Sequence, residues 1–209
     1  MLARGGAGVS KVELEHQSTS DGCFHDGYLG QISDVMESLR GKEVVVVAHS
    51  GAGGLVTSLP PTDFHTAIFL DAAFCIEPAA RFDLFGDRSL VEAWRQVATT
   101  NSGYLTPDFL RVFGEQIENP IQRERFVSTL RSVPVAVYEE QIEPHSDWRT
   151  DNPGLYIRWT DSYIDDAARA EKAGLSVQVQ LGSHFEMINY PAIVSGLITD
   201  FVAQLSRGR

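Results

Sequence analysis

The chain has 209 residues, of which 43% are hydrophobic and 22% charged, and its formal net charge is −11. This length suits one domain with a full-sized core, and the excess of acidic residues argues against nucleic acid as a partner, because a polyanion would be repelled. No apolar run approaches the roughly 18 residues of a membrane span, and the start of the chain lacks an apolar signal segment. The two cysteines show no disulfide framework. We therefore expect a cytoplasmic protein without membrane contact.

The first part of the chain predicts three strands separated by two helices. Residues 9–16 alternate apolar and polar side chains, as a short strand does. Residues 28–39 repeat apolar side chains at the helical period and are followed by a glycine. Residues 43–49 form a valine run typical of a parallel strand buried on both faces. Small residues at 51–59 suit a short helix ended by two prolines, and 66–71 predict a second buried strand.

The middle of the chain changes character. Between residues 78 and 134, helical periodicity occurs over 84–99, 107–113 and 121–130. We predict that this region is a helical lid inserted between two strands. Its aromatic side chains either line an apolar acyl or alkyl pocket or pack within the lid, and packing is the favoured interpretation.

The last part of the chain returns to alternating elements. Strands are predicted over 155–160 and 176–181, and helices over 163–173 and 191–205. Strands that alternate with helices indicate an α/β fold with a mostly parallel sheet flanked by helices. We expect the whole chain to form a single domain of this class that carries the helical lid.

The valine run leads into a serine surrounded by small residues, Ala48-His49-Ser50-Gly51-Ala52. A serine on a sharp turn between a strand and a helix is typical of a nucleophile elbow, with the pattern G-x-S-x-G. Alanine replaces both outer glycines here. Such a turn would lift the Ser50 hydroxyl to the carboxyl edge of the sheet, and the Gly51 N–H, at a helix N-terminus, would stabilise an oxyanion. A tight turn without chemistry is an equally good interpretation of Ser50 taken alone.

A histidine follows the last predicted strand in the loop Gly182-Ser183-His184. A general base for Ser50 is expected there, late in the chain, in the order Ser, Asp, His. The pair Ser50 and His184 therefore favours catalysis over two unrelated loop residues. His49 is predicted to pack or hydrogen-bond beneath the turn, and with Gly51 it is also a candidate residue for binding the oxyanion or the substrate. The histidines show no metal-ligand spacing, so neither a metal nor another cofactor is predicted.

These motifs resemble those of the α/β-hydrolase superfamily, in particular small bacterial members. The matching segments are Val47-Ala-His-Ser50-Gly-Ala-Gly53, Phe69-Leu-Asp71-Ala72 and Gly182-Ser-His184. The resemblance covers most of the chain from about residue 9. It implies Ser50 as nucleophile, His184 as base and an activity of the esterase, lipase or thioesterase kind on a small molecule. It does not imply which substrate.

The resemblance leaves the acid of the triad open between two aspartates. Its usual place is the loop after the strand at 155–160, where Asp161 lies. Some members use the end of the preceding strand instead, where Asp71 lies. Asp161 is slightly favoured. Asp165 and Asp166 fit the solvated first turn of a helix, where carboxylates suit the helix dipole.

The resemblance also implies a further strand ahead of the elbow strand, followed by a loop that donates the second N–H to the oxyanion. The printed sequence begins at about the end of the helix that follows that strand. Three alternatives are open: the gene product starts further upstream, the two flanking strands pair directly, or another chain covers the gap in a homo-oligomer.

The leading hypothesis is a serine hydrolase or acyl-transfer enzyme that acts on a small, apolar ester or thioester through a Ser-His-Asp triad. Two alternatives belong to other classes. One is a lyase, cyclase or epimerase of the same fold that uses His184 as acid and base. The other is a non-catalytic protein that binds a ligand or a partner chain.

Overall fold

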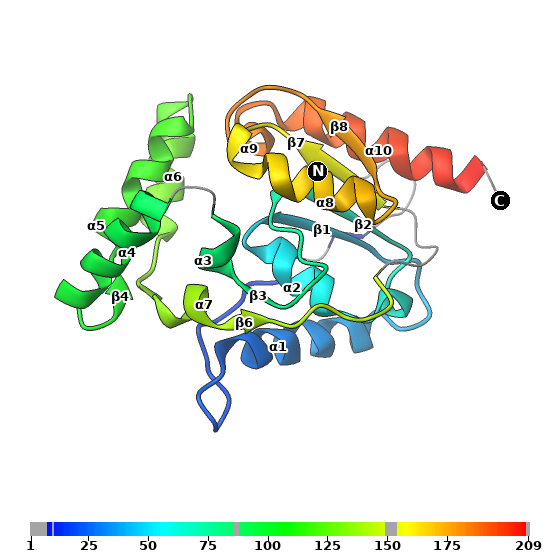
Figure 1. Cartoon of the computed structure of the whole chain (residues 1–209). Helices are drawn as coiled ribbons and strands as arrows, with labels where there is room; N and C mark the ends of the chain where they lie inside the picture. Colours follow the sequence, from blue (N-terminus) through cyan, green and yellow to red (C-terminus); the bar gives the residue numbers. More distant parts are fainter. Residues whose placement is uncertain (1–7, 10, 86–87, 149–153, 208–209) are drawn as a thin grey trace.

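A computed structural model describes residues 8–9, 11–85, 88–148 and 154–207 of the chain. Its centre is a four-stranded sheet in the order β1-β2-β7-β8, and all neighbouring strands are parallel. The strands are Val45–Ser50 (β1), Thr66–Ala72 (β2), Gly154–Arg158 (β7) and Ser176–Val179 (β8). The predicted α/β class with a parallel sheet is confirmed (Figure 1).

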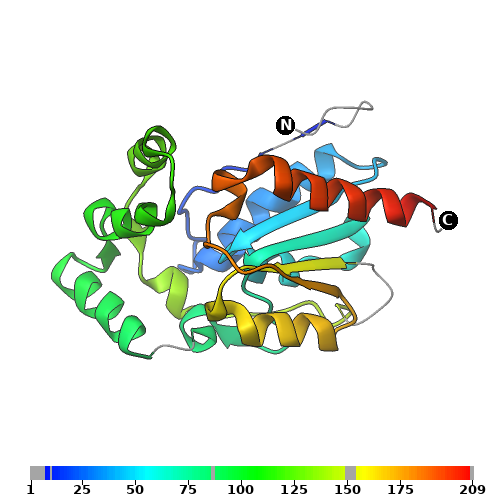
Figure 2. The ribbon, with the colours of Figure 1, turned by 90° about the horizontal axis from the view of Figure 1, so that it is seen from above.

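Helices cover both faces of this sheet, as the crossovers between parallel strands require. The helices around the sheet are α1 (Phe24–Ser38), α2 (Ala52–Ser58), α8 (Ile164–Lys172), α9 (Glu186–Asn189) and α10 (Pro191–Arg207). Side chains of α1, α2 and α8 pack on one face, and side chains of α10 pack on the other. Figure 2 shows the sheet between α10 and α8. Within the described ranges, no helix is both long and apolar enough to cross a bilayer.

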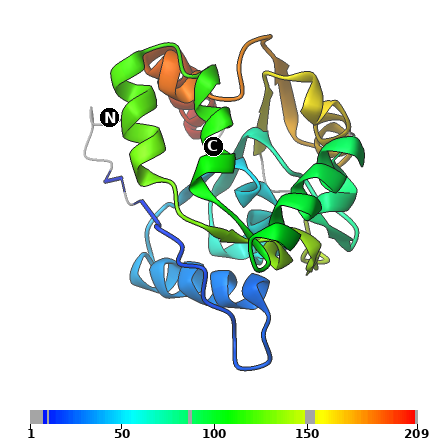
Figure 3. The ribbon, with the colours of Figure 1, turned by 90° about the vertical axis from the view of Figure 1, so that its left-hand side faces the viewer.

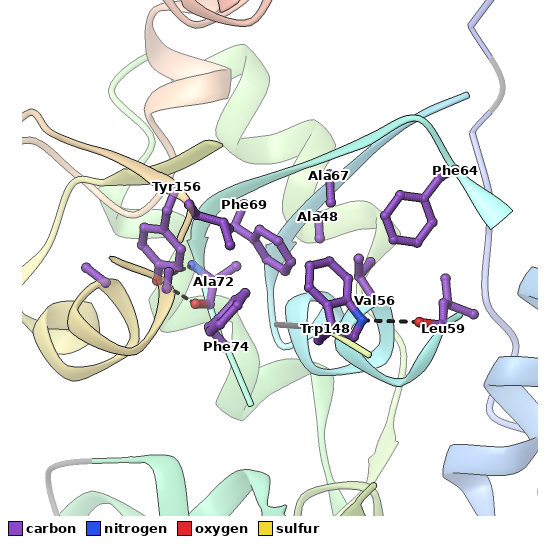
Figure 4. Packing of buried hydrophobic residues seen from close by; sticks show 13 residues of the cluster. Ala48, Val56, Leu59, Phe64, Ala67, Phe69, Ala72, Phe74, Trp148 and Tyr156 are labelled. Atoms are coloured by element: carbon purple, nitrogen blue, oxygen red, sulfur yellow. Dashed lines mark hydrogen bonds between the residues drawn. The ribbon is translucent and has the colours of Figure 1, made fainter. Parts of the chain in front are cut away.

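The central strand β2 is buried along its whole length. Its side chains alternate, so Phe69 joins the cluster under α2 and α8 while Ile68 joins the cluster under α10. Around Phe69 the rings of Phe74, Trp148 and Tyr156 pack together, with ring centroids 5.0–6.2 Å from that of Phe69. Figure 4 shows this aromatic cluster. It fixes the segment that follows β2 against the first face of the sheet.

The elbow strand β1 differs from the prediction of a strand buried on both faces. It lies at the edge of the sheet, and Val47 is 46% exposed. Ala48 faces the covered side and is buried, whereas Val45 is only partly buried against the cluster under α10. In the described part of the chain no strand pairs with the outer edge of β1. The valine run therefore predicts a β-strand correctly, but it does not indicate how many strands pair with it.

The strand predicted over residues 9–16 is absent from the described residues of that segment, with Val9 73% and Val12 37% exposed. The segment instead runs beside α1 (Figure 3). The Gln31 side chain of α1 bonds to both the N–H and the C=O of Glu15, at 2.8 and 3.0 Å. Alternating apolar and polar side chains do not by themselves form a strand, because the backbone also needs a neighbouring strand to hydrogen-bond with. The alternative in which this segment pairs directly with the elbow strand is therefore wrong.

A helical block lies beside the sheet, on the left in Figure 1. It contains α3 (Arg81–Leu84), α4 (Arg88–Thr100), α5 (Pro107–Leu110), η2 (Arg111–Gln116) and α6 (Pro120–Thr129). Its apolar side chains form their own cluster, in which the Trp94 ring contacts those of Phe82, Phe85, Phe109 and Phe113. The preference for aromatic packing within the block is confirmed, and its action as a lid stays a prediction.

Short elements join the block to the sheet. Two antiparallel pairs connect β3 (Ala79–Ala80) with β6 (Gln141–Ile142) and β4 (Tyr104–Leu105) with β5 (Val133–Pro134). The remaining helical turns are η1 (Pro61–Asp63), α7 (Ala136–Glu139) and η3 (Asp161–Tyr163).

Candidate active site

Two strands end in strained residues at the same edge of the sheet. Ser50 at the end of β1 has a φ of 55°, and Asp71, the penultimate residue of β2, has a φ of 42°. The register between the strands shifts there, because His49 lies opposite Leu70 while Ser50 lies opposite Ala72. Asp71 is therefore the extra residue of a bulge. Non-glycine residues with positive φ cost on the order of 1–3 kcal/mol and cluster at functional sites.

The turn after Ser50 is tightly packed. A Cβ atom added at Gly53 would lie 2.1 Å from Ala73 O, and one added at Gly54 would lie 2.5 Å from Ile142 Cδ1. Gly53 therefore lets α2 approach the backbone that follows β2, and Gly54 lets it approach the Ile142 side chain of β6. The buried Ala48, in the place of the first glycine of the elbow pattern, fits within the same packing.

The Asp71 carboxylate is fully buried and accepts four hydrogen bonds. The donors are the N–H groups of Trp159 and Thr160 at 3.0 Å each, Thr160 Oγ1 at 2.8 Å and His184 Nδ1 at 2.7 Å. Burial by itself would raise the pKa of Asp71, but the hydrogen bonds from His184, Thr160 and Trp159 outweigh it and hold the pKa below its usual value. Asp71 is thus an ionised group in a fixed position.

Side chains of Tyr156 and Asp166 bind the backbone that follows Asp71. Tyr156 OH donates to Ala72 O at 2.5 Å and accepts from Ala72 N at 3.2 Å (Figure 4). Phe74 N donates to Asp166 Oδ1 at 2.8 Å, and Arg169 binds the same oxygen at 2.6 Å. The expectation of a solvated Asp166 is wrong, because this side chain faces the sheet and is buried. Its burial raises the pKa of Asp166.

The His184 imidazole lies between the acid and two other rings. Since a carboxylate only accepts, the Nδ1 bonded to Asp71 carries the proton, which leaves Nε2 as an acceptor. The His49 ring lies 4.3 Å away between centroids, and the Tyr163 ring lies 5.3 Å away and nearly parallel at 7°. Gln116 Oε1 of the helical block accepts from the His184 N–H at 3.2 Å. The Asp71 carboxylate therefore fixes the orientation of the His184 ring, and the role of His184 as a base stays a prediction.

His49 supports the loop that carries His184. Its Nε2 lies 2.8 Å from His184 O, and because a carbonyl only accepts, Nε2 carries the proton. Burial, with His184 nearby, lowers the pKa of His49 to about 3, so the ring is neutral. The predicted hydrogen bond beneath the turn is present, and a role of His49 in binding substrate stays a prediction.

The nucleophile candidate has a partner that the sequence did not indicate. Ser50 Oγ lies 3.2 Å from Tyr163 OH. Among the hydrogen bonds of the described residues, none joins Ser50 to His184. No sequence pattern marks Tyr163. Its only signal is its place in the loop after β7, next to the position where an acid is expected.

Asp161 lies in the same turn as Tyr163 but points away from His184. Its side chain is 82% exposed, and it accepts from Arg158 Nη1 at 2.9 Å. The preference for Asp161 over Asp71 does not agree with these contacts. The η3 turn begins three residues after the last residue of β7, and within it Tyr163 contacts Ser50 while Asp161 is exposed to solvent.

Gly51 begins the turn into α2, with φ −59° and ψ −19°. Its carbonyl accepts a hydrogen bond of 3.4 Å from Nε of Arg81, which is 4% exposed and also donates to Val137 O. The sequence did not indicate this buried arginine. The role of the Gly51 N–H toward an oxyanion stays a prediction. In the described ranges, no group of three or more His, Cys, Asp or Glu side chains could hold a metal ion.

Comparisons with known proteins bear on the family and the fold of the chain. A family model described as "Alpha/beta hydrolase family" matches residues 6–195, whereas none of the curated proteins compared matches the chain.

Solved structures show the same fold at low sequence identity. One is an extracellular α/β-hydrolase from a Paenibacillus species, described as sharing structural and functional homology with tobacco salicylic acid binding protein 2. It is 13% identical to this chain, with a TM-score of 0.71, and the match covers 84% of this chain and 78% of the hydrolase. A carboxylesterase of the thaumarchaeon Nitrososphaera gargenis is 13% identical with a TM-score of 0.61, covering 88% and 74%. The pyrethroid hydrolase PytH is 17% identical with a TM-score of 0.56, covering 85% and 76%.

Proposed function

Because the chain belongs to the α/β-hydrolase family, we propose that it is a serine hydrolase or acyl-transfer enzyme for small esters or thioesters. The observation that carries this proposal is the hydrogen bond between Asp71 and His184 beside a serine of positive φ. A charged carboxylate, an oriented imidazole and a strained serine are the three parts that nucleophilic acyl transfer needs. The names of the neighbouring carboxylesterase and pyrethroid hydrolase support an ester as substrate.

The proposed reaction has two halves. Ser50 Oγ attacks the acyl carbon while His184 Nε2 takes its proton, and the Asp71 carboxylate stabilises the imidazolium that forms. His184 then protonates the leaving oxygen or sulfur, which departs and leaves an acyl group on Ser50. Water or another acceptor attacks this acyl-enzyme in the second half, again with His184 as base. Asp71 is the proposed acid of the triad in place of Asp161.

A second candidate rests on one observation. Ser50 is hydrogen-bonded to Tyr163 rather than to His184. The His184 imidazole could therefore exchange a proton with a substrate directly, without first taking one from Ser50. A lyase, cyclase or epimerase would use His184 and Asp71 in this way. In that case Ser50→Ala would keep activity and His184→Ala would lose it.

The test is intact-mass spectrometry after incubation with a fluorophosphonate. One adduct is expected on wild type and none on Ser50→Ala or His184→Ala. Ser128→Ala, an exposed serine of α6, serves as the matched control and should be labelled like wild type. A folded wild type without an adduct would contradict the proposed function and favour the second candidate.

A further inference from the structure

The Tyr163 side chain contacts both the proposed nucleophile and the proposed base. Its hydroxyl lies 3.2 Å from Ser50 Oγ, and its ring lies parallel to the His184 imidazole with centroids 5.3 Å apart. It is half-buried at the end of η3. A residue in this position is within reach of any atom that becomes bonded to Ser50.

The need for such a residue follows from the oxyanion. In this fold the negative oxygen of the tetrahedral intermediate binds two N–H groups, one after the nucleophile and one from a loop that precedes the elbow strand. Gly51 is in place to supply the first. In the part of the chain that the structure describes, β1 is the first strand, and the Tyr163 hydroxyl lies within hydrogen-bond distance of Ser50 Oγ.

We propose that the Tyr163 hydroxyl donates the second hydrogen bond to the oxyanion formed at Ser50. This inference rests on the proposed function. When Ser50 Oγ bonds to the acyl carbon, the C=O electron pair moves to the oxygen and the serine proton moves to His184. That oxygen is bonded to the same carbon as Oγ, so a donor already within hydrogen-bond distance of Oγ needs only a small shift to reach it. When the C=O bond re-forms, the bond to the leaving group breaks and His184 protonates it. Tyr163 keeps its proton throughout.

The surroundings of Tyr163 suit a neutral donor. Burial raises the pKa of Tyr163, an effect that the hydrogen bond to Ser50 opposes only in part, so the phenol remains protonated. A hydrogen bond from a neutral hydroxyl to an anionic oxygen is shorter and stronger than one to the Ser50 hydroxyl. The interaction therefore strengthens as charge develops, which is the condition for stabilising a transition state. The parallel contact with His184 keeps the phenol ring in place beforehand.

The test compares wild type with Tyr163→Phe, which retains the ring and its contact with His184 but removes the donor. For hydrolysis of p-nitrophenyl acetate, kcat should fall by about 10²–10³, the typical effect of losing one oxyanion donor, while KM is unchanged. The affinity for an alkylboronic acid, which forms a tetrahedral anion on serine, should fall by a similar factor. Tyr104→Phe, an exposed tyrosine of β4, is the control and should behave as wild type.

The outcomes separate this inference from the proposed function. A Tyr163→Phe enzyme within about twofold of wild type in kcat would overturn the inference alone. A lower kcat with unchanged boronic acid affinity would also overturn it, because Tyr163 would then act only by positioning Ser50 or His184. A wild type that forms no fluorophosphonate adduct would overturn both. If Tyr163→Phe does not fold, 3-fluorotyrosine at position 163, a more acidic donor of almost the same shape, should raise kcat, and an unchanged kcat would count against the inference.

Discussion

β1 and β2 lie side by side, and each carries a residue with positive φ at its carboxyl end, but the two ends are held differently. The Asp71 carboxylate on β2 is fully buried and accepts four hydrogen bonds, whereas the Ser50 hydroxyl on β1 has a single one among the described residues, with Tyr163. β2 has neighbours on both sides, and β1 lies at the sheet edge. The comparison teaches that this sheet edge holds the Asp71 carboxylate through several groups, whereas it holds the Ser50 hydroxyl through Tyr163 alone among the described residues.

The largest expected effect is on catalytic efficiency and concerns Asp71, the side chain held by four hydrogen bonds. Asp71→Asn should lower kcat/KM by about 10⁴, because an amide facing Nδ1 favours the imidazole tautomer with its proton on Nε2. The activity is measured with an activated ester, and the fold is checked by thermal melting. Asp161→Asn is the matched control and should stay near wild type, since this side chain is exposed. Loss of activity in Asp161→Asn alone would restore Asp161 as the acid.

The next effect separates a central strand from an edge strand. Phe69→Ala should lower the free energy of unfolding by about 3–5 kcal/mol, because it leaves a cavity in the aromatic cluster. Val47→Ala should change it by only about 0.5 kcal/mol, because Val47 is 46% exposed. Urea unfolding measures both. Equal losses would mean that the outer side of β1 is covered in solution.

A third effect concerns pH and the residue before Ser50. The pKa of His49 is about 3 in the folded chain, against 6.5 ordinarily. The unfolded chain therefore binds a proton that the folded chain does not as the pH falls below 6.5, and stability should decrease from there toward pH 3. Urea unfolding of wild type and His49→Gln from about pH 7 to about pH 4.5 measures this. The variant should show the flatter dependence, and parallel curves would contradict the assignment.

The smallest effect compares the strain at the two strand ends. Ser50→Gly should raise the free energy of unfolding by about 0.5–1 kcal/mol, because glycine accepts positive φ and Ser50 makes few contacts. Asp71→Gly relieves similar strain but should lower stability, since it leaves the buried N–H groups of Trp159 and Thr160 without an acceptor. Thermal melting measures both variants. A stabilised Asp71→Gly would show that those hydrogen bonds contribute little.

The sequence predicts well what short stretches of chain decide. The turn around Ser50, the loop that carries His184 and the alternation of strands and helices all depend on local period and turn chemistry. Apart from the strand predicted over residues 9–16, the structure has these elements within a few residues of the expected places.

Features that depend on distant partners were predicted less well. The exposure of Val47 depends on which elements lie beside the edge strand β1. The contact of His184 with Asp71 rather than Asp161 depends on how the loops that carry these residues meet at one edge of the sheet. The contact of Tyr163 with Ser50 joins residues 113 positions apart, and no local pattern encodes it.

The separate apolar core of the helical block has a consequence for local unfolding. A region with its own core can open as one cooperative unit while the rest of the molecule stays folded. Gln116 of the block accepts two hydrogen bonds from the segment around His184. Its Oε1 accepts from the His184 N–H, and its backbone O accepts from Asn189 Nδ2. In hydrogen-exchange terms, the amides of α4, α5 and η2 should therefore exchange as a group, at lower protection than those of β2, and each such opening would break the contacts of Gln116 with the loop that carries His184.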